Sequence, residues 1–407
     1  MRATSFAIYL WRANNPLMAT HEFLLIASLG IIAGTVLGAL FPTIPITVFV
    51  AGLAMLAFVS TAFPHARGVS VAGVAMVFLL LCSISFIRTT RYAPPEPSDR
   101  AFFSAASERT TAILQHTLVN PSYALIDGIL TGHDAALPYD IKQQFNITGT
   151  RHITAVSGMN ITILANVFLA LLIAIGLRRT HAMPATLFAI IWYVLMIGAP
   201  ASAVRAGIMG SLLVIKQLFG RPGSSLRLLI YAVAGMLMMR PDLLVSDIGF
   251  QLSVGATAGI ILLQPILQRW LRMVPEFAAL RSSISTTLAA YAFTIPFISY
   301  YFGTISVSAV PANVLIGPAV TWIFVSGGVG VLIAMLIPVL AYIALSPAHF
   351  VSTYVLSVVD ILSRVPYASI AWHMTTLWWS IPYYALLLLF IHKNSTNDRY
   401  IRVKSES

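Results

Sequence analysis

The chain has 407 residues, of which 58% are apolar and only 9% are charged, and its mean hydropathy is +0.87. This composition excludes an ordinary soluble enzyme fold and indicates a protein built inside a lipid bilayer. The formal net charge of +11 permits a polyanionic ligand, although basic residues at the ends of membrane spans also set orientation and explain much of the excess.

Apolar runs of about 20 residues recur along the sequence, and each is long enough to cross the hydrocarbon core as a helix. We therefore predict an all-α fold, a polytopic transmembrane helical bundle of about 12–13 segments with at least one re-entrant segment among them. The first part of the chain, 1–91, is expected to form a three-helix membrane unit with spans at 22–41, 44–63 and 68–87. Cys82 lies in an apolar run and is the single cysteine, which excludes an intrachain disulfide.

A change of composition follows at Arg88, and we expect residues 92–149 to form a polar extramembrane linker. The stretch Tyr92–Arg100 contains several prolines and predicts an extended chain, whereas Glu108–Leu118 predicts a short amphipathic helix.

Apolar segments return in 150–392, the main membrane bundle, and residues 393–407 are expected to form a basic cytoplasmic tail. The expected spans in this bundle are 161–177, 184–199, 204–219, 226–239, 250–268, 284–302, 308–325, 328–346, 349–362 and 376–391. The positive-inside rule places the N-terminus in the cytoplasm and is satisfied at the C-terminus if one late segment is re-entrant. The Pro- and Gly-containing stretch Val310–Pro318 is the candidate.

Two ionisable residues lie within or at the start of expected spans, where an unpaired charge costs several kcal/mol. Arg205 follows a predicted helix break at Gly198–Ser202, and Asp247 precedes a polar-containing span that includes Gln251 and Ser253. These residues are interpreted either as part of a transport pathway, with Asp247 bracing Arg205, or as a structural ion pair or side chains that snorkel to the membrane interface.

A second polar feature precedes the span at 161–177. If residues 150–160 are helical, Thr150, Thr154, Ser157 and Asn160 form one stripe that is suited to line a pore. Ordinary hydrogen bonding between helices is the alternative.

Enzyme chemistry finds little support in the sequence. Ser157 lacks the nucleophile-elbow sequence and, on a helix, points about 140° away from His152. The spacing of His133, Asp134, Asp140 and His152 matches no metal-ligand pattern, and the chain has no Walker A sequence. We therefore expect no catalytic residue, no metal and no cofactor.

Several motifs, taken in order, resemble the membrane competence domain of the ComEC/Rec2 family. They lie in Ala124–Gly132, Phe145–Asn160, Ser202–Met209, Leu243–Ser253 and Ser306–Pro318. The sequence Asp-Ile-Gly-Phe-Gln-Leu-Ser, which ends at Ser253, is the strongest of them.

The chain departs from the family pattern at Met159 and Asn160, where Leu and His are commonest, and it resembles a short form without the OB-like and metallo-β-lactamase-like domains of full-length relatives. The resemblance implies a channel core in the bacterial inner membrane that takes up single-stranded transforming DNA. The implied partners are the DNA strand, the lipid bilayer and separate DNA-receptor, nuclease and helicase proteins. A small-solute or ion transporter with broken helices near Pro200 and Pro311, and a non-transporting scaffold, are the alternatives.

The candidate residues for the pore or DNA path share polar side chains at expected membrane depth. They are Thr150, His152, Thr154, Ser157, Asn160, Arg205, Asp247, Gln251, Ser253 and Asn313.

Overall fold

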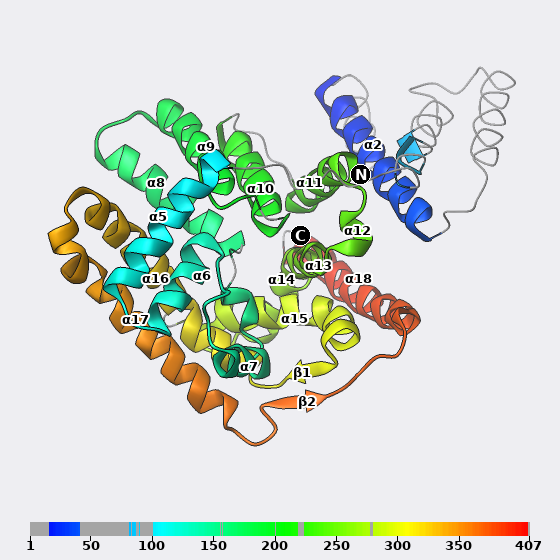
Figure 1. Ribbon diagram of the computed structural model, residues 1–407. Helices are drawn as coiled ribbons and strands as arrows, with labels where there is room; N and C mark the ends of the chain where they lie inside the picture. The colour runs from blue at the N-terminus through cyan, green and yellow to red at the C-terminus, as the bar shows by residue number, and fades with distance from the viewer. Residues whose placement is uncertain are drawn as a thin grey trace, which may run out of the picture. The chain divides into compact units, whose positions relative to one another are not determined.

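The structure is a computed structural model, and it describes residues 16–40, 81–82, 84–86, 89, 101–154, 156, 158–199, 201–218, 224–276 and 280–405. Its described part is formed by helices and one pair of three-residue strands, which confirms the all-α prediction (Figure 1). Most of the expected spans 44–63 and 68–87, the linker residues 92–100, Ser157 and Pro200 lie outside the described residues.

The chain divides into two compact units. The first unit comprises residues 1–98 and 222–251, and within it α2 (Pro16–Leu40) packs against α11 (Ser225–Met239) and α12 (Leu243–Ser246). The second unit comprises residues 99–221 and 252–407. The boundary between Gln251 and Leu252 falls inside α13 (Ile248–Leu262), so this helix carries the chain from one unit into the other.

The second unit contains the remaining helices and strands. They are α5 (Ala101–Thr117), α6 (Ser122–Thr131), α7 (Tyr139–Ile147), η1 (Arg151–Thr154), α8 (Gly158–Ala174), α9 (Arg179–Met196), α10 (Ala201–Leu218), α14 (Gln264–Trp270), α15 (Leu280–Phe302), β1 (Thr304–Ser306), α16 (Ala309–Leu336), η3 (Pro338–Leu340), α17 (Ala341–Ser363), β2 (Ser369–Ala371), η4 (Leu377–Trp379) and α18 (Ser380–Ser405). Helix α18 includes much of the sequence that we expected to form a basic tail.

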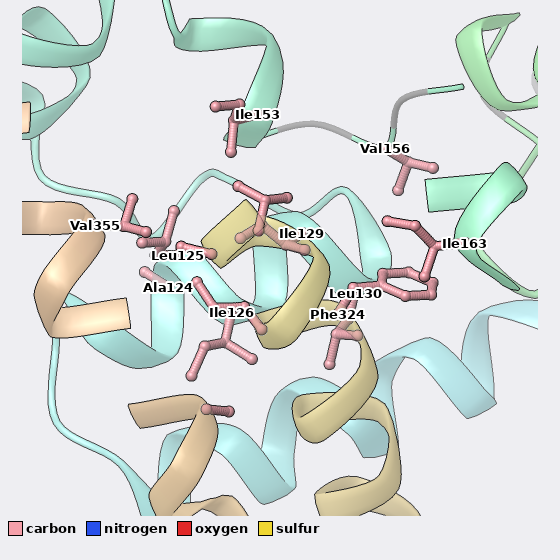
Figure 2. Packing of buried hydrophobic residues seen from close by; sticks show 14 of the residues in the cluster. Ala124, Leu125, Ile126, Ile129, Leu130, Ile153, Val156, Ile163, Phe324 and Val355 are labelled. Atoms are coloured by element: carbon pink, nitrogen blue, oxygen red, sulfur yellow. The ribbon is translucent and has the colours of Figure 1, made fainter. Parts of the chain in front are cut away.

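The short helix α6 lies at the centre of the second unit. It packs against α5, α16 and α17, which Figure 1 shows around it. Every residue of α6 except Tyr123 is buried, and Leu125, Ile126 and Ile129 have no exposed surface. Figure 2 shows these side chains packed with Phe324 of α16 and Val355 of α17. Close packing of this kind fixes the positions of the surrounding helices.

This location differs from the sequence interpretation of residues 92–149 as a polar linker. Helix α5 covers the residues of the expected amphipathic helix, but α6 is a core element. The scattered Gly, Asp, His and Pro residues on either side of α6 suggested a solvated segment, because composition does not reveal that a short apolar helix is enclosed by helices from the other end of the chain.

Two described helical segments are long and apolar enough to cross a membrane, α16 and the segment Pro338–Ser363 that contains α17. A third is added if α13 and α14, which meet at 49°, form one broken span. The presence of such helices fits the predicted membrane protein, and the count of about 12–13 crossings stays a prediction.

The prediction of a re-entrant segment at Val310–Pro318 was wrong in its position. Helix α16 runs without interruption through these residues, and it also joins the two spans expected at 308–325 and 328–346. Pro311 lies in the first turn, where the missing N–H costs no intrahelical hydrogen bond. Pro311 therefore provides no broken helix for the solute-transporter alternative. The bent junction of α13 and α14 is the described candidate for a broken or re-entrant segment.

Glycines in α16 allow the close approach of α17 rather than breaking the helix. A Cβ atom at Gly330 would lie 2.7 Å from the carbonyl oxygen of Ala344, and one at Gly327 would lie 3.7 Å from Cβ of Ala348. The two helices are antiparallel, since the Tyr354 hydroxyl, further along α17, donates to the carbonyl oxygen of Leu315, near the start of α16, at 3.4 Å.

We predict that Gly330→Ala destabilises the protein although Ala is the better helix former. The added methyl group forces α17 away from α16, and overpacking of this kind costs roughly 1–3 kcal/mol. Thermal unfolding in detergent should show a lower midpoint. Gly317→Ala on the same helix is the matched control, because no neighbouring atom lies within 4 Å of its Cβ position. An unchanged midpoint for Gly330→Ala would contradict the close contact.

Candidate functional site in the helical bundle

Arg205 is buried in the second unit, with 2% of its surface exposed. Its Nε donates a hydrogen bond to the Ser253 hydroxyl at 2.6 Å, which joins α10 to α13. The structure thus brings together two predicted site residues that are far apart in the sequence. A buried guanidinium has lost its hydration, so its charge requires hydrogen-bonding partners within the protein.

Asp247 and Gln251 belong to the first unit, at the start of α13. The Asp247 carboxylate accepts a hydrogen bond from the backbone N–H of Phe250 at 2.8 Å, as an N-terminal cap does. Gln251 Nε2 donates to the carbonyl oxygen of Leu244 at 2.8 Å. These contacts stabilise the turn between α12 and α13. The pairing of Asp247 with Arg205 stays a prediction.

The single helix on which we based a polar stripe at 150–160 does not form. Residues Arg151–Thr154 form the short 3-10 helix η1, and α8 begins only at Gly158. A backbone contact explains the position of η1, since a Cβ atom on Gly128 of α6 would lie 2.7 Å from the carbonyl oxygen of Thr154. The described stripe residues therefore do not share one helix face.

Thr150, Thr154 and Asn160 are buried and bonded to protein groups. The Thr150 hydroxyl pairs with that of Thr148 at 2.8 Å, and the Thr154 hydroxyl donates to the carbonyl oxygen of Arg151 at 3.0 Å. Asn160 Nδ2 donates to the carbonyl oxygen of Ile129 at 2.8 Å. Their place on the DNA path stays a prediction, because these contacts serve the fold.

The carbonyl groups at the end of α6 accept hydrogen bonds from side chains of two other helices. Asn160 of α8 bonds the carbonyl oxygen of Ile129, and the Tyr193 hydroxyl of α9 donates to the carbonyl oxygen of Leu130 at 2.8 Å. Gly132, in a left-handed conformation with φ of 85°, donates its N–H to the carbonyl oxygen of Gly128. The last carbonyl groups of a helix lack intrahelical partners, so these contacts fix α8 and α9 on α6.

His152 and Asn313 meet at a second polar junction, between η1 and the first turns of α16. The His152 imidazole is hydrogen-bonded to the Asn313 side chain and to the backbone of Gly149. Gly149 has a φ of 65°, and a Cβ there would lie 2.9 Å from the Cβ atoms of Ser306 and Ala309. The chain therefore requires glycine at this position.

The surroundings of His152 lower its pKa from the usual 6.5, mainly through burial, while its two hydrogen bonds act in the opposite direction. The residue as a whole is nevertheless exposed to solvent. We attribute the difference to the imidazole end, which its internal hydrogen bonds direct into the protein. His152 is thus a predicted DNA-path residue that is exposed to solvent while its imidazole is hydrogen-bonded within the second unit.

Sequence reasoning missed the carboxylate of Asp127. This side chain lies on α6 with 1% of the residue exposed, and accepts hydrogen bonds from the hydroxyls of Thr111 at 2.9 Å and Thr131 at 2.7 Å. Burial raises the Asp127 pKa, opposed by the two hydroxyl bonds and the charge of His133. The signal was present in the sequence as one aspartate in the middle of the apolar run Ala124–Leu130.

Charged side chains also lie close to the end of α6. The Arg151 guanidinium forms an ion pair with Asp134 at 2.5 Å and bonds the Thr154 hydroxyl. Across the described ranges, no three His, Cys, Asp or Glu side chains gather in a way that could hold a metal ion. His133 and Asp134 instead take part in the contacts of Asp127 and Arg151.

A model of the competence protein family matches residues 129–395, a range that contains every predicted site residue and most of the second unit. The chain belongs to the competence protein family. The family match begins within α6 and extends into α18.

A relative of this competence protein is ComE operon protein 3 of Bacillus subtilis (strain 168), which is 26% identical over 228 residues. The alignment covers 56% of this chain and 27% of that protein. The competence protein described here therefore corresponds to about a quarter of the relative's length. No solved structure matches it.

We predict that Asn160→Ala in this competence protein lowers stability, because the buried carbonyl group of Ile129 loses its donor. An unsatisfied buried polar group costs roughly 1–3 kcal/mol. Thr162→Ala, on an exposed position of the same helix, is the control and should leave the thermal midpoint nearly unchanged. If Asn160→Ala retained full stability and lost only DNA uptake, a pore-lining role would replace the capping role.

We also predict that Asp127→Asn removes a pH dependence of stability. Because the folded-state pKa of Asp127 is above the ordinary value of 3.8, the folded state binds more protons than the unfolded state between the two pKa values. The free energy of unfolding contributed by this group is therefore highest at low pH and falls as pH rises through that window.

Unfolding midpoints measured against pH should show a smaller fall for Asp127→Asn than for the wild type. The variant should be at least as stable at neutral pH, since its amide oxygen still accepts from the threonine hydroxyls. Asp140→Asn, at an exposed position in the first turn of α7, is the control. Parallel curves for Asp127→Asn and wild type would contradict the assignment.

Proposed function

We propose that this chain forms the membrane-embedded core through which a single strand of transforming DNA crosses the bacterial inner membrane. Membership of the competence protein family over residues 129–395 is the observation that carries the proposal. Helices suited to cross a bilayer and the net charge of +11 support it. The DNA is a transient ligand, and no catalytic step is part of the proposed role.

The described polar groups suggest how a strand is handled. Phosphates need cationic or hydrogen-bonding partners, and weak, spaced contacts allow the strand to leave again. The predicted residues Thr150, Thr154, Asn160 and Arg205 are buried, so a strand can reach these four only if helices move apart. Arg205 is the strongest candidate for a phosphate contact, because its guanidinium places a cation between α10 and α13.

Separate proteins are proposed to complete the uptake system. A DNA receptor would deliver the strand, and a nuclease and a helicase would process or draw it. We propose that the N-terminus is cytoplasmic, in keeping with the basic residues at the expected cytoplasmic ends of the spans.

The test is internalisation of labelled DNA in a strain deleted for this gene and complemented with variants. Wild type should restore uptake, and Arg205→Gln should reduce it at least about tenfold, since a charge-assisted hydrogen bond is worth roughly 1.5–3 kcal/mol. Arg364→Gln is the matched control, because Arg364 is a largely exposed arginine paired with Asp360 and should tolerate the change.

Two further outcomes are informative. Ser253→Ala should keep most of the uptake if Arg205 contacts phosphate, whereas a loss equal to that of Arg205→Gln would make Arg205 a positioning residue for α13. Membrane fractions must contain each variant at wild-type level. Normal uptake in the deletion strain would overturn the proposal and favour a solute transporter, which predicts saturable stabilisation by a small solute.

A further inference from the structure

The connection between α17 and α18 exposes an unusual set of aromatic side chains. Over residues 364–379 the chain forms β2, a loop and η4 instead of a long helix. The side chains share high exposure, with Tyr367 at 84%, Trp372 at 61%, Trp378 at 75% and Trp379 at 65%. We call this segment the aromatic ledge.

The backbone of the aromatic ledge is held firmly. Strand β2 pairs with β1 in antiparallel register, and the two lie side by side in Figure 1. The N–H of Trp372 donates to the carbonyl oxygen of Gly303 at 2.9 Å, and the Ser299 hydroxyl donates to the carbonyl oxygen of Trp372 at 2.6 Å. These bonds hold the backbone at Trp372 against β1 and the end of α15.

Several helices also begin or end beside the aromatic ledge. Helix α17 ends where the ledge begins, and α18 starts at Ser380 where it finishes. The N–H groups of Val307 and Ser308, just before α16, donate to the carbonyl oxygen of Ala368 at 2.9 and 3.1 Å. Helix α15 ends at Phe302 and leads directly into β1, so the end of α15 and the start of α16 lie beside the β1–β2 ribbon.

Polar and apolar groups are mixed along the ledge. His373 and Thr375 are exposed between the aromatic residues, and the exposed Arg364, which precedes Tyr367, pairs with Asp360 at 2.9 Å. Exposed side chains in the middle of α17 include Phe350 and Tyr354 together with His349 and Thr353. Tryptophan and tyrosine prefer the boundary between headgroups and acyl chains, where an apolar ring and a polar N–H or O–H are both accommodated.

We propose that the aromatic ledge lies in the headgroup layer of the membrane, with Trp372, Trp378 and Trp379 as anchors at the boundary with the acyl chains. Its ligand is the bilayer surface itself. The continuity of the ledge with α17, which is long and apolar enough to span the membrane, carries this assignment. The antiparallel pair of α16 and α17 then enters and leaves the bilayer at this level.

The position of the aromatic ledge also bears on the depth of the junction between His152 and Asn313. Asn313 lies in the first turns of α16, and Gly149 approaches Ser306 and Ala309 at the start of that helix. The junction of His152 with Asn313 is thus near the headgroup layer and away from the bilayer midplane. That position suits a contact made as a ligand enters or leaves the membrane.

Depth-dependent quenching of tryptophan fluorescence tests the ledge. The chain has seven tryptophans, and a variant that retains only Trp378, with Phe at the others, is reconstituted in phosphatidylcholine vesicles brominated at a shallow or a deep acyl position. Shallow bromines should quench Trp378 at least about twofold more than deep bromines, because quenching requires near contact with the bromine atom. The matched control retains only Trp322, which is 67% exposed near the middle of α16 and should be quenched more by deep bromines.

Three results would overturn the assignment. Stronger quenching of Trp378 by deep bromines would place it in the acyl core. No quenching of Trp378 where Trp322 is quenched would leave the ledge in water or under a protein partner, and equal quenching at both depths would remove the interfacial preference. If the multiple variant does not fold, Trp378→Phe in the wild-type background should reduce shallow quenching selectively. None of these outcomes depends on DNA uptake.

Discussion

The second unit depends on the burial of one short helix whose last carbonyl groups receive hydrogen bonds from elsewhere. Leu125, Ile126 and Ile129 of helix α6 have no exposed surface, and the last residues of the helix, Leu130 and Thr131, are buried as well. Buried carbonyl groups without donors are costly, and Asn160 and Tyr193 supply the donors. This requirement fixes α8 and α9 on α6, while packing fixes α16 and α17 on its other sides.

The same requirement explains why predicted pore residues are engaged in the fold. A small polar side chain between membrane helices can line a path or satisfy a backbone group, and it seldom does both in one conformation. In this structure Asn160, Thr150 and Thr154 satisfy protein groups. His152 and Arg205 differ from them, since His152 remains exposed to solvent and Arg205 carries a positive charge.

A transport role in this architecture implies a change of conformation. Polar bonds join α10 to α13 and η1 to α16, whereas Gly327 and Gly330 of α16 pack closely against α17. We expect motion at the polar contacts and rigidity in the α16–α17 pair, because a polar bond can be exchanged for another and a packed surface must separate as a whole. The aromatic ledge would then hold the rigid pair at a constant depth.

The sequence by itself determined the helical membrane class, because composition and apolar runs act locally and need no tertiary information. It also singled out Arg205, Ser253, His152 and Asn313, since polar groups in apolar segments are rare. Only the tertiary structure decided that Arg205 meets Ser253 and that His152 meets Asn313, because these pairs join distant helices. It also decided that α6 is the core, that Asp127 is buried and that Pro311 and the glycines of α16 interrupt no helix. Those properties depend on what lies beside each residue in space, and a single sequence does not record its neighbours.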